Sequence, residues 1–238
     1  MKQGRFRFHD GLNDLLAVGR RATEICLPLN GDETAKHLIE SLGVPHTEVG
    51  QIVVNGGQVD FGYRVQDGDQ VAVFPFSYEG DSIQIDPLRF ILDNHLGRLA
   101  AYLRMLGFDA LYRNDYQDEE LASVSSHEDR ILLTRDKRLL MRSLVTRGCW
   151  LRSKAPRVQL EEVVQRYHLA AAIRPFQRCV RCNAELVSVR KEDILHRLEP
   201  LTRRYYEDFA LCPGCDQIYW KGSHYERMQQ IVQNVLYR

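Results

Sequence analysis

Phe90-Ile91-Leu92-Asp93-Asn94-His95-Leu96-Gly97-Arg98-Leu99 opens the stretch of sequence that decides the fold, which continues to residue 111. A continuous apolar run ends in an acid, and apolar residues then recur at helical spacing. The helical repeat consists of Leu96, Leu99, Ala100, Leu103 and Leu106. Gly107 ends this repeat, and a second apolar run follows. The stretch therefore predicts a strand, a helix and a second strand.

The same alternation continues along the chain and gives the fold class. Further strands are expected at 109–113, 131–134 and 149–151, and helices at 115–126, 136–147 and 159–167. We expect the helix at 136–147 to bury Leu139, Leu140 and Leu144. Strands that alternate with helices imply an α/β domain with a parallel sheet covered on both faces.

Residues 1–80 have a different pattern. Two strands, a helix at 34–43 that ends in glycine, and two more strands predict a β-grasp domain. Val54-Asn55-Gly56 and Gly68-Asp69-Gln70-Val71 resemble ubiquitin-like sulfur carriers, which act through a free Gly-Gly tail. This chain instead runs on into further sequence, so we expect a docking or scaffolding module rather than a sulfur carrier.

The domain organisation follows from these patterns. We expect a β-grasp domain at 1–80, a polar linker at 77–87, an α/β domain at 88–170 and a cysteine-containing domain at 174–238. The 238 residues are enough for such an arrangement, and 44% apolar with 27% charged residues is ordinary for a globular protein. No apolar run approaches a membrane span or a signal peptide, so we expect a cytoplasmic protein without a membrane partner.

Acidic residues follow three of the predicted strands. Asp93 follows the first, Asp118 opens the helix after the second with Glu119 beside it, and Asp136 follows the third. Each alone could be a helix cap. Three acidic clusters at one end of a parallel sheet would repel one another without a cation, and Mg²⁺ or Mn²⁺ is the hard cation that carboxylates prefer. Such a site favours hydrolysis of a nucleic-acid backbone.

Four of the six cysteines form two CxxC pairs. These are Cys179, Cys182, Cys212 and Cys215, with 29 residues between the pairs. Four thiolates at this spacing predict a closed, tetrahedral structural zinc site in a zinc ribbon, with an iron–sulfur cluster or a metal-free remnant as alternatives.

The motifs from residue 88 onward resemble the Mut-seven C-terminal RNase family, a branch of the PIN-like nucleases. The segments that carry the resemblance are Leu92-Asp93, Leu96-Gly97-Arg98-Leu99-Ala100, Asp118-Glu119-Glu120-Leu121, Arg130-Ile131-Leu132-Leu133-Thr134-Arg135-Asp136 and Tyr219-Trp220-Lys221-Gly222-Ser223-His224. Members of this family are often preceded by a ubiquitin-like domain. The resemblance implies that Asp93, Asp118 and Asp136 hold Mg²⁺ or Mn²⁺ and catalyse the reaction, with Glu119 competing for the second place.

The expected function is therefore a metal-dependent ribonuclease, that is, a phosphodiester hydrolase. Residues 81–238 carry 25 Lys and Arg against 21 Asp and Glu, which is compatible with a polyanionic partner. Arg98, Arg135 and Lys221 are the predicted substrate-binding residues, and Arg104 and Lys137 are further candidates for phosphate contacts, although such side chains are also typical of a solvated surface. Aromatic residues among the basic residues of the ribbon predict RNA binding, although Tyr219 and Trp220 could equally pack the ribbon against the α/β domain. The ubiquitin-like domain could bind a protein partner. The alternative is a non-catalytic RNA-binding or adaptor protein.

Overall fold

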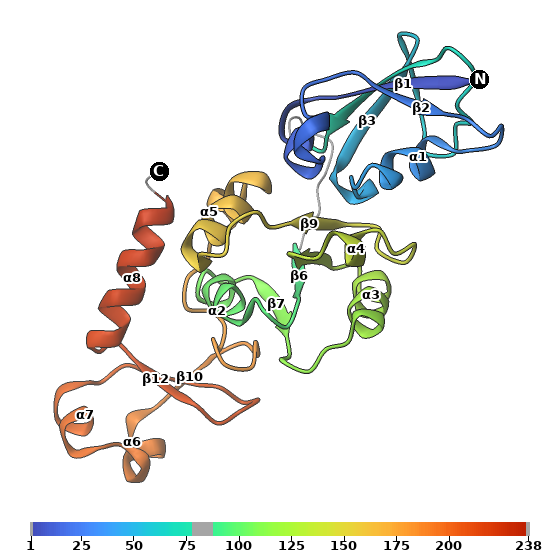
Figure 1. Cartoon of the computed structure of the whole chain (residues 1–238). Coiled ribbons are helices and arrows are strands. Elements are labelled where there is room, and N and C mark those ends of the chain that lie inside the picture. The colour runs from blue at the N-terminus through green and yellow to red at the C-terminus, as the bar shows by residue number, and fades with distance from the viewer. Residues whose placement is uncertain (1, 78–87, 237–238) are drawn as a thin grey trace. The chain divides into compact units, whose positions relative to one another are not determined.

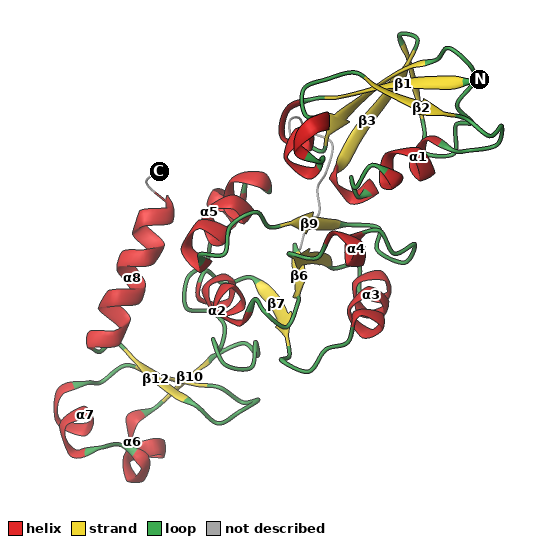
Figure 2. Cartoon of the chain, viewed as in Figure 1, coloured by secondary structure: helices red, strands yellow, loops and turns green. Residues whose placement is uncertain are grey.

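The computed structural model describes residues 2–77 and 88–236 of this mixed α/β protein (Figure 1). Contacts divide the chain into two compact units, residues 1–84 with 117–151, and residues 85–116 with 152–238. Nearly all of the predicted linker at 77–87 lies outside the described residues. Within the described residues, no helix is long and apolar enough to span a membrane. Figure 2 shows how helices and strands are distributed along the chain.

The first part of unit one is a five-stranded sheet with one α-helix, which confirms the β-grasp prediction. The strands are in the order β2-β1-β5-β3-β4, with β1 and β5 parallel and the other pairs antiparallel. The elements are β1 (Gln3–Phe8), β2 (Ile25–Pro28), α1 (Ala35–Ser41), β3 (Val49–Val54), β4 (Gly57–Val59) and β5 (Gln70–Pro75).

Simple sequence rules explain this sheet. Phe6 and Phe8 alternate with arginines in β1, and both phenylalanines are buried in the core of the domain. Thr34 caps α1 by accepting a hydrogen bond from the backbone N–H of His37. Asn55 and Gly56 have φ values of 50° and 86°, the left-handed conformation that a tight β3–β4 hairpin requires.

The second part of unit one contains α3 (Asp118–His127), β8 (Ile131–Thr134), α4 (Lys137–Leu140) and β9 (Gly148–Trp150), with β8 and β9 parallel. Here the prediction of a helix over 136–147 is wrong. The chain leaves α4 at Met141 through turns in which the N–H groups of Met141, Arg142 and Val145 donate to carbonyls three residues earlier, and Val145 is completely buried. Leu144, predicted to be buried, is 51% exposed. α3 also begins three residues later than predicted.

Several hydrogen bonds join the two parts of unit one. The Glu48 carboxylate accepts a hydrogen bond from the backbone N–H of Trp150 at 2.7 Å. His46 Nε2 lies 2.7 Å from the Val145 carbonyl oxygen. The Trp150 side chain packs against the core of the β-grasp domain. The segment 117–151 is thus attached to that domain by buried contacts.

Unit two begins with the strand, helix and strand predicted for residues 90–111. The strands β6 (Arg89–Leu92) and β7 (Asp109–Tyr112) are parallel, and α2 (Gly97–Met105) connects them. Gly107 ends the helical segment with φ 98°, and a Cβ there would lie 2.1 Å from the Arg174 carbonyl oxygen. α5 (Pro156–Arg166) packs against α2.

The C-terminal part of unit two is a small antiparallel sheet with short helices. The elements are β10 (Val187–Val189), α6 (Lys191–Ile194), α7 (Pro200–Tyr205), β11 (Phe209–Leu211), β12 (Ile218–Trp220) and α8 (Ser223–Leu236). Its hydrophobic core contains four buried residues, Ile194, Leu198, Phe209 and Ile218. Such a core is too small to stabilise a domain without further support.

Candidate functional site

Asp93 follows β6 and is half-buried. The N-cap residue of α2 is Leu96, whose side chain makes no cap, so Asp93 is not the N-cap residue of this helix. Asp93 Oδ1 lies 3.5 Å from the backbone nitrogen of His95. The Tyr112 hydroxyl of β7 donates a hydrogen bond to the Asn94 carbonyl at 2.9 Å and so holds the turn that follows Asp93. Strand, turn and tyrosine together fix the backbone of this acid.

Asp118 and Glu119 begin α3. The Gln117 side chain caps this helix, and Glu120 completes a capping box. Arg142 Nη2 lies 2.8 Å from Glu119 Oε1 and 3.8 Å from Asp118 Oδ2. A hydrogen bond from the backbone N–H at the helix start lowers the pKa of Glu119 most, and Arg142 lowers it further. Of the two acids, Glu119 makes the closer ion pair with Arg142.

Asp136 caps α4. Its Oδ1 accepts a hydrogen bond from the Arg138 N–H at 2.8 Å, and its own N–H donates to the buried Thr134 hydroxyl at 2.9 Å. The Trp150 indole N–H donates to the carbonyl oxygen of Arg135 at 3.2 Å. Backbone and side-chain contacts therefore hold both sides of this turn, and the helix-cap interpretation applies to Asp136.

The predicted site residues are distributed over both units. Asp118, Arg135 and Asp136 belong to unit one, whereas Asp93, Arg98 and Lys221 belong to unit two. The side chains of Arg98, Arg135 and Lys221 are exposed. Lys221 Nζ lies 3.5 Å from Asp208 Oδ2 in an exposed ion pair. Two other candidate phosphate contacts have structural partners instead: Lys137 Nζ donates to the Leu15 carbonyl oxygen, and Arg104 is buried.

The four predicted cysteines come together in unit two. Their sulfur atoms all lie within 4.8 Å of one another, with Cys182 Sγ 3.3 Å from Cys212 Sγ and Cys179 Sγ 3.5 Å from Cys215 Sγ. Zn–S bonds of about 2.3 Å in a tetrahedron place sulfurs roughly 3.8 Å apart. The cluster thus has the size and the chemistry of a zinc site. Among the described residues, this is the one group of three or more His, Cys, Asp or Glu side chains that lie close enough together to hold an ion.

Both cysteine pairs sit in the same kind of turn. The backbone N–H of Asn183 donates to the Cys179 carbonyl, and that of Asp216 donates to the Cys212 carbonyl, both at 2.9 Å. Asn183 and Asp216, each directly after a second cysteine, have positive φ values of 75° and 60°. The repeated geometry directs two sulfurs from each turn toward one point, as a zinc ribbon requires.

Tyr219 is a neighbour of the cysteine cluster that sequence reasoning missed. Its hydroxyl lies 3.1 Å from Cys179 Sγ. Burial has the larger effect on the pKa of Tyr219 and the Cys179 sulfur the next largest, and both raise it. The hydroxyl therefore stays protonated and donates. Burial raises the pKa of Cys179, but hydrogen bonds from Tyr219 and then from the Cys182 N–H lower it to about 6. Partial burial and then the neighbouring cysteine sulfurs raise the pKa of Cys182 to about 12, so a second thiolate beside the first needs a cation.

Arg104 and Asn183 anchor the first cysteine turn to the α/β part of unit two. Arg104 Nη1 donates to the carbonyls of Val180 and Arg181 at 3.2 and 2.9 Å, and its Nε donates to the Ala110 carbonyl at 2.8 Å. The Asn183 side chain accepts a hydrogen bond from the Ala110 N–H at 3.0 Å and donates to Asp109 Oδ1 at 2.7 Å. The ribbon is therefore attached to α2 and β7 by buried polar contacts.

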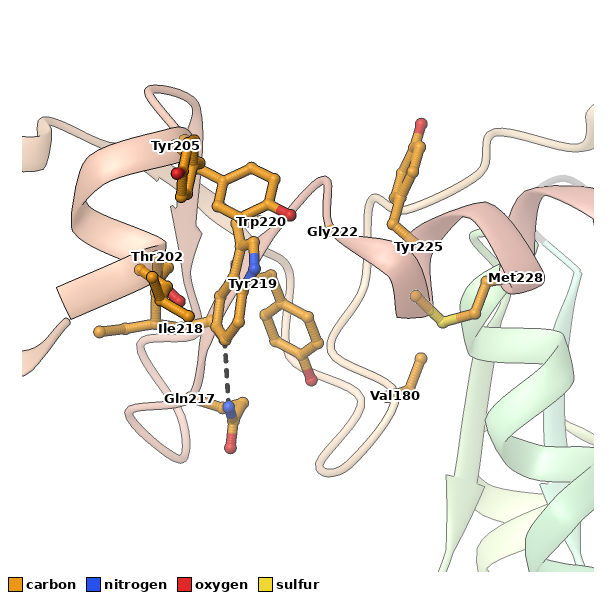
Figure 3. A pocket seen from close by; sticks show the side chains of 12 residues that line it. Val180, Thr202, Tyr205, Gln217, Ile218, Tyr219, Trp220, Gly222, Tyr225 and Met228 are labelled. Atoms are coloured by element: carbon orange, nitrogen blue, oxygen red, sulfur yellow. Dashed lines mark hydrogen bonds between the residues drawn. The ribbon is translucent and has the colours of Figure 1, made fainter. Parts of the chain in front are cut away.

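An aromatic cavity of about 510 Å³ lies beside the cysteine cluster (Figure 3). Tyr205 of α7, Trp220 of β12 and Tyr225 of α8 line it, with Gln217 contributing an amide. Figure 3 shows Trp220 between Tyr205 and the α8 side chains. Tyr205 is 64% and Trp220 39% exposed, so solvent reaches these rings.

Residues 88–232 match the family described as the Mut7-C RNAse domain, and residues 1–88 match the family described as Mut7-C ubiquitin. No curated protein matches the chain. Two solved structures are similar to about a third of it. Small archaeal modifier protein 1 of H. volcanii is 18% identical over 32% of this chain and 98% of its own, with a TM-score of 0.26. The HVO 2177 protein of Haloferax volcanii is 23% identical over 33% of this chain and 87% of its own, with a TM-score of 0.28.

The RNAse-domain match spans more than half of the chain and includes the three candidate acids and the four clustered cysteines. The ubiquitin match covers the part that folds as a five-stranded β-grasp sheet. The chain therefore belongs to the Mut7-C RNAse domain family and carries a Mut7-C ubiquitin-like domain before the RNAse domain.

Proposed function

We propose that this protein is a metal-dependent ribonuclease that hydrolyses the phosphodiester bonds of RNA. The observation that carries the proposal is the match of residues 88–232 to the RNAse domain. The position of Asp93 supports it, because this acid follows a buried strand and is not the N-cap residue of the next helix. Carboxylates in such positions are typical of ligand sites in parallel sheets.

In this proposal Asp93, Asp118 and Asp136 hold Mg²⁺ or Mn²⁺. Carboxylate oxygens are the ligands that these hard cations take, and Asp136 retains a second oxygen besides the one that caps α4. We assign the second place to Asp118, since Glu119 makes the closer ion pair with Arg142. When bound, the ion would polarise the phosphodiester and lower the pKa of a water nucleophile. No Asp or Glu occurs between Asp136 and Glu161, which favours one ion over two.

The remaining roles belong to cations of the chain. The exposed guanidinium groups of Arg98 and Arg135 would bind phosphate oxygens on the RNA, because arginine pairs with phosphate in a bidentate manner. Lys221 would bind a phosphate after releasing Asp208. The four cysteines would hold structural zinc, and the ribbon would hold part of the RNA. Placement of the protein in the cytoplasm stays a prediction, as does a protein partner for the ubiquitin-like domain.

Cleavage of a labelled single-stranded RNA in Mg²⁺ or Mn²⁺ tests this function. We expect Asp93→Asn and Asp136→Asn each to lower the rate about a hundred-fold or more, since each removes a charged ligand. Asp118→Asn should do the same and Glu119→Gln should not. Asp115→Asn is the matched control, because this exposed acid pairs with Arg113 and is not a proposed ligand. Equal activity of the Asp93→Asn and Asp115→Asn variants would refute the assignment.

A non-catalytic RNA-binding or adaptor protein is the second candidate. The capping role of Asp136 favours it, because that acid already has a structural function. This alternative predicts that RNA binds to the wild-type chain without any metal-dependent cleavage, and that the three Asp→Asn variants bind RNA as the wild type does. The same cleavage experiment, with RNA binding measured in parallel, separates the two candidates.

A further inference from the structure

Two adjoining cavities share one aromatic wall in the zinc-ribbon part of unit two. The first measures about 510 Å³ and the second about 410 Å³. Residues that line both are Val180, Tyr219, Trp220, Tyr225 and Met228. Trp220 therefore stands between two hollows that solvent can reach. This size is within the usual range of small-ligand sites.

The chain holds the central rings of this wall in place. Trp220 lies in β12 and pairs with Phe209 of β11. Gly222 lies against the indole, and a Cβ there would come within 2.8 Å of Trp220 Nε1. Tyr225 packs on Phe176 with ring centroids 4.5 Å apart. Rings fixed in this way lose little conformational freedom when a ligand binds.

The lining of the first cavity suits a flat, aromatic ligand with polar edges. Tyr205, Trp220 and Tyr225 contribute aromatic rings to its lining, whereas Gln217 and Thr202 contribute an amide and a hydroxyl. A nucleobase has this chemistry, because it stacks on aromatic rings and bonds through its edges. Paired bases are already stacked, so the ligand must come from a single strand.

Cations beside the cavities suit a ligand that carries phosphates. The Arg204 guanidinium lies 5.4 Å from the centre of the Tyr205 ring. Lys221 and Arg178 line the second cavity, and Arg178 also pairs with Glu185 at 3.1 Å. Asp208 is the acid of that cavity and pairs with Lys221 at 3.5 Å. The negative charge of Asp208 repels an anionic strand but not an uncharged ligand. The effect of Asp208 on binding therefore distinguishes a polyanion from an uncharged ligand.

We propose that the cavity lined by Tyr205, Trp220 and Tyr225 binds one unstacked base of a single-stranded RNA, with the strand's phosphates toward Lys221. This site deepens the proposed ribonuclease function, on which it rests for the choice of RNA. It assigns the aromatic residues of the ribbon a binding role that is separate from the acids. Tyr219 stays with the cysteine cluster through its hydrogen bond to Cys179.

Tryptophan fluorescence tests the site directly, because the chain has two tryptophans. A Trp150→Phe background leaves Trp220 as the source of emission, and an added Asp93→Asn substitution prevents cleavage while zinc stays bound. A short oligouridylate should quench Trp220 emission. We expect Tyr205→Ala and Trp220→Leu each to weaken binding about 5- to 100-fold. Because Trp220→Leu removes the fluorophore, its affinity is measured by fluorescence anisotropy of labelled RNA. Trp220→Phe should retain most of the affinity, and Asp208→Asn should increase it.

Leu195→Ala is the matched control, since Leu195 is also 39% exposed in the ribbon but lies outside both cavities. Unquenched emission at saturating RNA, or equal affinity of the Trp220→Leu and Leu195→Ala variants, would overturn the site. Stronger binding of the same oligomer as DNA would overturn the assignment to RNA. Quenching of Trp220 in a chain that shows no metal-dependent cleavage would support the base site and refute the ribonuclease proposal alone.

Discussion

Glu48→Ala is the substitution that best tests how the ubiquitin-like domain is attached to the segment 117–151. Glu48 is 2% exposed and lies in the turn His46–Glu48 that packs on β9. Its Oε1 accepts the Trp150 backbone N–H at 2.7 Å. Alanine removes this acceptor, and a backbone N–H that loses its acceptor in a buried site is costly. The substitution should therefore loosen β9 from the domain.

The expected effect follows from the type of bond that is lost. A hydrogen bond to a charged acceptor contributes about 1.5 to 3 kcal/mol. Because 1.4 kcal/mol corresponds to a factor of ten, hydrogen exchange of the Trp150 amide should accelerate about 10- to 150-fold. Glu48→Gln keeps an oxygen acceptor without the charge, so its effect should be the smaller of the two. The Trp150 indole bond to the Arg135 carbonyl should weaken as well.

Hydrogen exchange detected by mass spectrometry over the peptide that contains β9 provides the measurement. Glu33→Ala is the matched control, since the Glu33 carboxylate also accepts backbone N–H bonds, from Asn30 and Gly31, but does so within the ubiquitin-like domain. It should change exchange near residue 30 and leave β9 unchanged. Equal protection of β9 in the wild type and in Glu48→Ala would refute the attachment that we describe.

Three further predictions concern other parts of the chain. Gly107→Ala should lower the free energy of unfolding by about 2 kcal/mol or more in urea titrations, because φ is 98° and the new Cβ would collide with the Arg174 carbonyl. Arg142→Met should raise the pKa of Glu119 toward its usual 4.5, as measured by NMR of the carboxyl carbon. The ion pair stabilises the fold above this usual pKa, and the stabilisation is lost as the pH falls through the lowered pKa of Glu119. Chelation should remove one zinc per chain and abolish the protection of β10–β12, whereas retained protection would contradict a structural role for the metal.

Local sequence signals were sufficient to predict those features of the structure in which one type of interaction dominates. The helical repeat from Leu96 to Leu106 and its end at Gly107 correctly predicted α2, because burial and backbone conformation act over a few residues. The cysteine cluster was equally predictable, since two CxxC turns have few ways to share a cation. These signals are short in range and depend little on the rest of the fold.

Other features depend on contacts between distant segments, which a single sequence does not reveal. Arg104 was one of several candidate phosphate contacts, yet it bonds carbonyls more than 70 residues away. Tyr219 was expected to stack on RNA or to pack the ribbon, and its hydroxyl instead contacts a cysteine sulfur. The helix predicted at 136–147 ends early because burial of Val145 prevails over the leucine repeat. In each case a tertiary contact overrides a local pattern.

The contacts around Asp136 imply that the ubiquitin-like domain is more than a tethered module. The two family matches meet at residue 88, but the buried contacts of unit one cross that boundary. Lys137, directly after Asp136, donates to the Leu15 carbonyl and lies 5.2 Å from the Trp150 ring. Trp150 in turn packs on the ubiquitin-like core and holds the carbonyl that precedes Asp136. Because both neighbours of this acid have partners that depend on the ubiquitin-like domain, that domain supports the geometry of a proposed metal ligand.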